Sequence, residues 1–430
     1  MALPDFVLSA AGVLFTRLLG AATQFVFYLV VAQRFGAEGL GLFVLAFTSS
    51  IAASTVSCWG IDQVALRHLS GHHAHGEFAA FRALFAHSIA LVLLISTSIA
   101  LAMGLLSGPI AMQIFGKPEL APILRMLAFS IVPFSLLQLL GESVRATGRV
   151  VLSAVLQTAL APVLALAFIS LAPSQDAVSS AALYYTLAYF AAMVAAIFFQ
   201  SPRTSPLAVP DGKSENLSPR QLLKTATPVA WVTIFSVWLG FSETLLLGLY
   251  RAADEVGYYA ASLRLVLLVN FLLVALNGAL APKFAVLHRQ GEIRELISLA
   301  RRATLVMLTL SCPIFLALFL LPEILLAWFG DEFTAASTAL VILAVGQLVN
   351  IATGPVGIIL LMTGNAPAMQ RHLVITVLVN LALAFLLIPP FGIVGAACSA
   401  AAAMAVLNLL LLHSVYHIFS EAPRNGPGCG

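Results

Sequence analysis

A single arginine lies deep within the first apolar stretch of the chain. The segment GVLFTRLLGAATQFVFYLVVA, residues 12–32, carries one charge, Arg17, and residues 6–32 contain no other Asp, Glu, Lys or Arg. A guanidinium offers a planar fork of donors that suits phosphate oxygens, and it cannot lose its proton to escape burial. Arg17 is therefore either an anion ligand or one half of a structural ion pair, with Glu243 as a candidate partner.

Polar side chains recur at helical spacing on three apolar spans. Steps of three or four residues place side chains on one face of a helix. Three sets share this spacing: Arg17, Gly20, Gln24 and Tyr28; Ser135, Gln138, Glu142 and Arg145; and Thr233, Ser236, Gly240 and Glu243. A charge at the bilayer centre costs about 3 kcal/mol on insertion scales and usually faces a bundle interior or a wet cavity. The three faces therefore predict a water-filled cavity lined by several helices.

The candidate ligands fall into a cationic set and an anionic set. The predicted substrate-binding residues are Arg17, Gln24, Arg264, Gln138 and Arg145. The candidates for coupling to a proton or a cation are Glu243, Glu142 and Asp62. These carboxylates could equally be partners of the arginines, and Asp62 and Arg145 lie at span ends where an interfacial role is open. Arg125, near the start of its span, can extend to the interface without any function.

The composition requires a membrane environment. Of the 430 residues, 61% are hydrophobic and only 9% are charged, whereas a soluble domain has about a quarter of its residues charged. The mean hydropathy is +1.02. At about 1.5 Å per residue, the run 6–32 is about 40 Å long, enough to cross a ~30 Å hydrocarbon core. This length, with no basic residues before it, predicts a retained helix rather than a cleaved leader.

The apolar pattern predicts twelve transmembrane helices in an all-α integral membrane protein. Fifteen of the 21 basic residues fall in loops on one side when the spans are counted this way. The opposite loops carry only Arg34, Lys117 and Arg251. Because cytoplasmic loops are enriched in Lys and Arg, both termini are expected in the cytoplasm.

The two halves of the chain resemble each other at an offset of about 216 residues. This shift superposes Thr147-Gly148 on Thr363-Gly364, Gly41 on Gly257, Gly141 on Gly357, Pro173 on Pro389, and Ala37-Glu38 on Ala253-Asp254. We therefore expect two six-helix bundles, related as parallel repeats, around a central cavity. The expected division is a first bundle at 1–200, a Pro- and Ser-rich cytoplasmic linker at 201–225, a second bundle at 226–420 and a cytoplasmic tail at 421–430.

Several patterns of catalytic or metal-binding proteins are missing from the sequence. The four cysteines show no metal or disulfide spacing, and the sequence lacks the phosphate-binding G-x-x-x-x-G-K-[ST] loop. The histidines of the segment RHLSGHHAHGEF, residues 67–78, have no Cys or Asp framework, so a solvated loop is expected rather than a metal site. A membrane enzyme of glycan assembly would require a large outer loop, and none is predicted. We expect no enzyme, no cofactor and no nucleic-acid partner.

Five segments resemble a known family. LVVAQRFGAEGLGLFVLAF (29–47) is similar to the first loop and second span of the polysaccharide transporters, or Wzx-type flippases, of the multidrug/oligosaccharidyl-lipid/polysaccharide exporter superfamily. LLLGLYRAADEVGYYAASLRL (245–265) resembles their seventh and eighth spans. LAPKFAVLHRQGEI (280–293) with LARRATLVML (299–308), and ILLAWFGDEFTAASTALVILAVGQLV (324–349), extend the likeness over most of the chain.

The resemblance implies export of undecaprenyl-pyrophosphate-linked oligosaccharide from the inner to the outer leaflet by alternating access. It also implies membrane lipid, a polysaccharide polymerase and a chain-length regulator as partners, for O-antigen, capsule or exopolysaccharide assembly. The related lipid II flippases carry cavity arginines on the first and eighth spans, where Arg17 and Arg264 stand here. Those flippases have two further helices and more first-span arginines, which disfavours lipid II. An ion-coupled multidrug exporter remains the alternative, because Glu243 and Glu142 suit cations.

Overall fold

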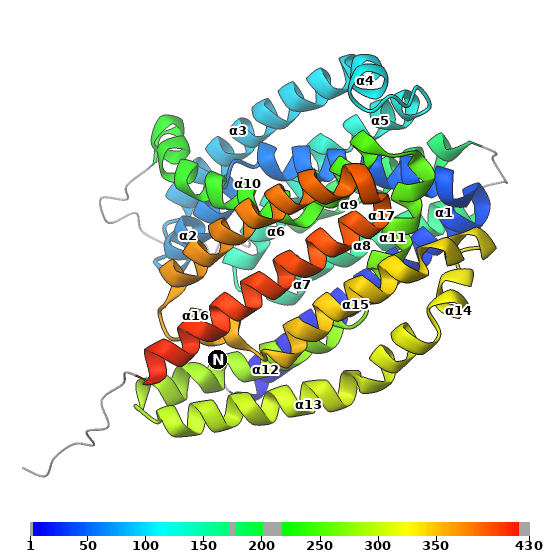
Figure 1. Ribbon diagram of the computed structural model, residues 1–430. Coiled ribbons are helices and arrows are strands. Elements are labelled where there is room, and N and C mark those ends of the chain that lie inside the picture. The colour runs from blue at the N-terminus through cyan, green and yellow to red at the C-terminus, as the bar shows by residue number, and fades with distance from the viewer. Residues whose placement is uncertain (1–2, 172–176, 201–216, 421–430) are drawn as a thin grey trace, which may run out of the picture. The chain divides into compact units, whose positions relative to one another are not determined.

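The computed structural model describes residues 3–171, 177–200 and 217–420, and within these ranges every regular element is a helix (Figure 1). The predicted all-α membrane fold is therefore confirmed. The elements up to the masked segment at 201–216 are α1 (Leu3–Ser57), α2 (Ile61–Ala74), α3 (Phe78–Leu105), α4 (Ser107–Pro109), η1 (Ile110–Ile114), α5 (Leu120–Ala128), α6 (Ile131–Ala146), α7 (Val150–Ala154), η2 (Val155–Ala159), α8 (Leu160–Leu171) and α9 (Val178–Phe199). The later elements are α10 (Pro219–Tyr250), α11 (Ala253–Leu267), α12 (Asn270–Arg289), α13 (Ile293–Leu320), α14 (Pro322–Ala327), η3 (Asp331–Ala336), α15 (Ser337–Ala352), α16 (Val356–Met362) and α17 (Ala366–Ser420).

Nine helices in the described ranges are long and apolar enough to cross a membrane, or ten if the bent pair of α11 and α12 forms one span. Two of the nine, α1 and α17, have 55 residues each and are broken at Gly36 (φ 69°) and Gly392 (φ 53°). A straight helix of that length would measure about 80 Å, far more than the ~30 Å hydrocarbon core. Each therefore has two arms that can cross separately. The count of twelve spans stays a prediction.

The second arm of α17 folds back along the first, as its orange and red ribbons show in Figure 1. A Cβ added at Gly395 would overlap the backbone at Leu387, so only glycine allows the chain to return this closely. Position 392 also requires glycine, because its positive φ is unfavourable for residues with a side chain. A proline pair, Pro389 and Pro390, precedes this reversal.

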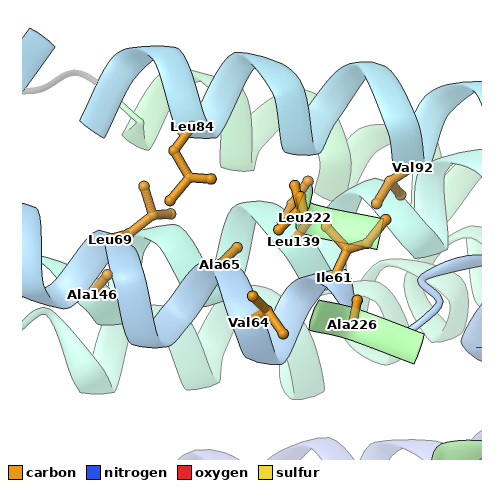
Figure 2. Close-up of a cluster of buried hydrophobic side chains, with 10 residues drawn as sticks. All are labelled: Ile61, Val64, Ala65, Leu69, Leu84, Val92, Leu139, Ala146, Leu222 and Ala226. Carbon is orange, nitrogen blue, oxygen red and sulfur yellow. The ribbon is translucent and has the colours of Figure 1, made fainter. Parts of the chain in front are cut away.

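The chain forms two compact units, Met1–Ala260 and Ala261–Gly430. In the first unit α2 is the centre of an apolar cluster (Figure 2). The cluster joins side chains of α2, α3, α6 and α10: Ile61, Val64, Ala65, Leu69, Leu84, Val92, Leu139, Ala146, Leu222 and Ala226. Because Leu222 and Ala226 are fully buried there, α10 belongs to this first compact unit.

The predicted linker, residues 201–225, falls partly between α9 and α10 and partly within α10. Residues 201–216 lie outside the described residues, while Pro219 begins α10. A capping box fixes this start, since the Ser218 side chain accepts from the Gln221 backbone and the Gln221 side chain accepts from the Ser218 backbone. The last residues of the segment 201–225 are thus helical. The division of the chain into two six-helix bundles at this segment stays a prediction.

The second unit is held by contacts among α13, α15, α16 and α17. Val356 and Leu360 of α16 pack with Leu411 on the second arm of α17. Gly346 lets α15 approach α17 closely, because a Cβ there would lie 2.7 Å from the Cα of Ala401. Close approach through small residues is the usual means of packing helices in a membrane, where lipid offers no hydrophobic drive.

Helix ends in the two halves share their geometry at the predicted offset. Thr147 directly follows α6 and Thr363 directly follows α16, and the next residues, Gly148 and Gly364, have φ of 82° and 81°. The helices α3 and α13 both have 28 residues and begin 215 positions apart. Equal turns at equivalent places support the internal repeat.

Candidate functional site

The predicted polar face of the first span divides into a buried part and an open part. Tyr28 is fully buried and packs edge-to-face against Phe43 and Phe47 of the second arm of α1. Gly20 of α1 packs against η2, because a Cβ added there would overlap the Thr158 carbonyl. The Arg17 side chain is exposed in the structure, and Gln24 is half-buried. Arg17 and Gln24 are thus the members of this face that remain available to a ligand.

The polar face of α6 is built into a hydrogen-bonded cluster. Glu142 is only 6% exposed, and its Oε1 accepts a hydrogen bond from Gln157 Nε2 at 3.2 Å. Its Oε2 lies 3.4 Å from Arg145 Nη1, one helical turn away. The same Gln157 amide also donates to the Gln138 carbonyl at 3.0 Å. A buried carboxylate is therefore held between an amide and a guanidinium, with Arg145 half exposed at the rim.

Gln157 was not among the residues that the sequence singled out. It lies in η2, a π-helical turn inside an otherwise regular span, and such turns are frequent at functional sites. Gly141 of α6 makes room for it, because an added Cβ would collide with the Gln157 side chain. Among the residues three or four positions from Gln157 only Ser153 is polar, so the sequence shows no extended polar face there.

Asp62 extends the α6 cluster toward α2. It is the second residue of α2, is half-buried, and accepts a hydrogen bond from Gln63 Nε2 at 3.2 Å. Its carboxylate interacts electrostatically with Glu142. The second arm of α1 is joined to α6 by the hydroxyls of Ser57 and Ser135, which lie 2.7 Å apart, and Ser135 also donates to the Ser54 carbonyl. The structure thus brings together Glu142 and Arg145, which the sequence had assigned to different roles, and Gln157 links them to the backbone carbonyl of Gln138.

The predicted polar face of α10 has exposed residues and one buried carboxylate. Ser236 and Gly240 are exposed and Thr233 is half-buried. Glu243 is only 5% exposed, and its Oε2 accepts a hydrogen bond from the Ser242 hydroxyl at 3.1 Å. Arg264 lies on α11 in the second compact unit and is half-buried. The predicted pairing of Arg17 with Glu243 stays a prediction.

Two cavities open on the first unit, both outside the polar faces. One of about 680 Å³ lies among the ends of α2, α6 and α9, next to His73, Arg149 and Phe199. The other, of about 390 Å³, lies between the start of the second arm of α1, the loop before α5 and the end of α10. It includes Glu38, Lys117 and Arg251. Burial lowers the pKa of Lys117, whose ammonium donates to the carbonyls of Phe115 and Gly248.

The histidine-rich segment has local partners in the structure. His72 Nδ1 lies 2.7 Å from Glu77 Oε2, and His75 Nδ1 lies 2.8 Å from the Gly71 carbonyl. Within the part of the chain that the structure describes, no three His, Cys, Asp or Glu side chains are grouped to hold a metal. His72 and His75 therefore have hydrogen-bond partners that are four or five residues away in the sequence.

Comparisons with known proteins agree with this architecture. The family described as "Polysaccharide biosynthesis protein" matches residues 7–288, and the MatE family matches residues 228–386. A probable low-salt glycan biosynthesis flippase, Agl15 of Haloferax volcanii, is 28% identical over 180 residues. That match spans 42% of this chain and only 38% of the relative's length.

Solved transporter structures share the fold at low sequence identity. The lipid II flippase MurJ in an inward closed conformation superposes with a TM-score of 0.74 at 15% identity, covering 95% of this chain and 87% of that one. An inward-facing multidrug resistance transporter of the MATE family superposes at 0.72 with 12% identity, covering 96% and 98%. With about two thirds of its length matched by the family model, the chain belongs to the polysaccharide biosynthesis protein family.

Proposed function

We propose that the protein is a flippase that moves undecaprenyl-pyrophosphate-linked oligosaccharide from the inner to the outer leaflet of the bacterial inner membrane. The observation that carries the proposal is Arg17, an exposed guanidinium in the middle of an apolar helix. A fixed cation at membrane depth suits a pyrophosphate that must leave water. The glycan and phosphates would pass through a polar cavity, while the lipid tail stays in the bilayer.

In this proposal one set of residues binds the substrate and another set binds the coupling ion. Arg17 and Arg264 bind the pyrophosphate, while Gln24, Gln138 and Arg145 offer hydrogen bonds to phosphate or sugar oxygens. Glu142, Glu243 and Asp62 take up the coupling proton or cation. The Glu142 cluster supports this division, because protonation of Glu142 would release Arg145, its neighbour at 3.4 Å. A released Arg145 could then meet the anionic cargo.

A deletion strain tests this function. Surface polysaccharide is measured after complementation with the wild-type protein, with Arg17→Ala or with Arg125→Ala. Arg125 is the matched control, since it is an exposed arginine in a membrane helix whose Nε donates to the Ser107 hydroxyl. We expect wild type and Arg125→Ala to restore the polymer and Arg17→Ala to fail at equal membrane levels. Normal polymer in the deletion strain would refute the flippase.

A multidrug exporter of the same superfamily is the second candidate. Two buried carboxylates, Glu142 and Glu243, and the MatE match over residues 228–386 favour it. An exporter of organic cations predicts that the deletion strain becomes sensitive to cationic drugs while its polysaccharide is unchanged. The same strains therefore separate the two functions.

A further inference from the structure

The larger cavity of the first unit has apolar, aromatic walls. It measures about 680 Å³ and is lined by Phe78 and Phe81 at the start of α3 and by Phe198 and Phe199 at the end of α9. The His73 ring packs edge-to-face against both Phe78 and Phe81. Phe198 is 79% exposed and Phe199 is 45% exposed, so these two rings are not part of the packed core. Ligand pockets of this size are typically lined by such side chains with a few polar groups.

Hydrogen bonds fix the wall that α6 and α9 share. The Ser143 hydroxyl donates to Gln200 Oε1 at 2.6 Å, and Gln200 Nε2 donates to the Leu140 carbonyl at 2.7 Å. Beyond the end of α6, Arg149 Nη1 donates to the Phe199 carbonyl at 3.0 Å. These bonds tie α6 and the loop that follows it to the end of α9. The cavity is therefore preformed, as ligand sites usually are.

Arg149 supplies the charge of the cavity. It is the one Lys or Arg among the lining residues that the structure describes, and no Asp or Glu is among them. A guanidinium has five N–H donors, and the bond to the Phe199 carbonyl uses Nη1. The other donors suit phosphate oxygens, which match the planar fork of an arginine. One fixed cation matches a headgroup with a single phosphate better than a pyrophosphate, which carries more negative charge.

The cavity lies where the sequence predicts the cytoplasmic surface of the membrane. Phe78 begins α3 and Phe199 ends α9, directly before the predicted cytoplasmic linker, residues 201–225. At this depth an acyl chain can enter from the hydrocarbon while its phosphate stays at the level of the headgroups. Basic pockets between helices on the cytoplasmic side of membrane proteins bind lipid headgroups.

We propose that this cavity binds one anionic phospholipid of the cytoplasmic leaflet, with its phosphate on Arg149 and an acyl chain against the four phenylalanines. Because Arg149 also bonds to the end of α9, the bound lipid stabilises the junction between α6 and α9. The lipid is a component of the first unit and not cargo, so the inference goes beyond the proposed function and does not depend on it.

Native mass spectrometry of the purified protein in a neutral detergent tests the site. Phosphatidylglycerol and phosphatidylethanolamine with identical acyl chains are the probes. We expect the wild type to retain phosphatidylglycerol about fivefold more tightly, as one basic residue near anionic lipid provides, and Arg149→Gln to lose this preference. Arg82→Gln is the matched control and should keep it, since Arg82 is exposed, directly follows Phe81 and is not among the lining residues.

A second variant tests the apolar wall. Phe198→Ser removes an exposed ring that the fold does not require, and it should weaken retention of phosphatidylglycerol by about threefold or more, because the acyl chain loses apolar contact. Inorganic phosphate probes a soluble anion and undecaprenyl pyrophosphate probes the cargo. Neither should displace phosphatidylglycerol at equal concentration.

Three results would show that no such lipid site exists: equal retention of the two phospholipids by the wild type, an intact preference in Arg149→Gln, or unchanged retention in Phe198→Ser. Displacement by inorganic phosphate would assign the cavity to a soluble anion, and displacement by undecaprenyl pyrophosphate would assign it to cargo. Either result also overturns the proposal. Retention is measured without transport, so failure of the proposed function shows in the polysaccharide assay alone.

Discussion

At the scale of single residues, the Glu142 cluster is the part of the site whose chemistry the structure defines best. A buried carboxylate is stable only where hydrogen bonds or a cation compensate for lost water. Gln157 supplies one hydrogen bond, and Arg145 supplies the charge. Gly141 provides the space for the amide. Any change to one partner leaves a polar group without compensation.

The Gln157→Leu variant tests this dependence. Leucine has a similar volume but cannot donate to Glu142 or to the Gln138 carbonyl. We expect a loss of about 1–3 kcal/mol in the free energy of unfolding, measured by denaturation in detergent, together with loss of complementation. Gln113→Leu is the control, an exposed glutamine in the other π-helical turn, η1. Equal stability of the two variants would refute the role of Gln157.

The sequence predicted Glu142 and Arg145 as members of one helix face because helical spacing is local. It could not predict Gln157, whose partner is on another helix. It also placed Tyr28 on a polar face, whereas the structure buries Tyr28 among aromatic rings. A tyrosine is compatible with either surrounding, so spacing alone does not decide.

At the scale of elements, glycines determine where helices end. Gly148 and Gly364 follow equivalent helix ends with φ of 82° and 81°, and neither has an atom within 4 Å of an added Cβ. Any cost of a side chain there is therefore backbone strain and not a clash.

Replacing either glycine by alanine should have the same effect. We expect Gly148→Ala and Gly364→Ala each to lower the free energy of unfolding by about 1–2 kcal/mol, the cost of a left-handed conformation for an L-residue. Thermal unfolding in detergent measures this. Gly108→Ala, with no positive φ and equally open space, should be neutral. A difference between the two variants larger than the effect itself would contradict equivalent turns.

The sequence indicated α10 as the first span of a second bundle because a polar linker precedes it. In the structure its side chains pack with those of α2, α3 and α6, and the division of the chain into two bundles stays a prediction. A linker is visible in composition, but the neighbour that a helix packs against depends on small residues such as Ala226 and Gly248, which apolar periodicity does not distinguish.

At the scale of the whole molecule, the distribution of basic residues predicts the orientation in the membrane. Reporter fusions test it. A phosphatase that is active only outside the cytoplasm is fused after Gln200 or at the C-terminus, and separately after Lys117. We expect activity only from the fusion after Lys117, since positive charge is retained in the cytoplasm. Activity from a C-terminal fusion would refute the predicted orientation and the even number of spans.

The membrane fold was predictable because composition and apolar run length are set by the bilayer. The repeat was predictable from glycines and charges at one offset, and the equal turns at Gly148 and Gly364 agree with it. Substrate identity was not predictable, since a cavity with few arginines fits many anions. Solved structures of a lipid II flippase and of a multidrug resistance transporter share this architecture.

The central claim is that the protein moves a lipid-linked glycan across the membrane with the help of Arg17. The most direct measurement is the sidedness of that glycan in everted membrane vesicles, read by its accessibility to a lectin or glycosidase. With the wild-type protein or Arg125→Ala, most lipid-linked glycan should be protected inside. In the deletion strain or with Arg17→Ala it should accumulate on the exposed face. Equal protection in the deletion strain and the wild type would contradict the claim.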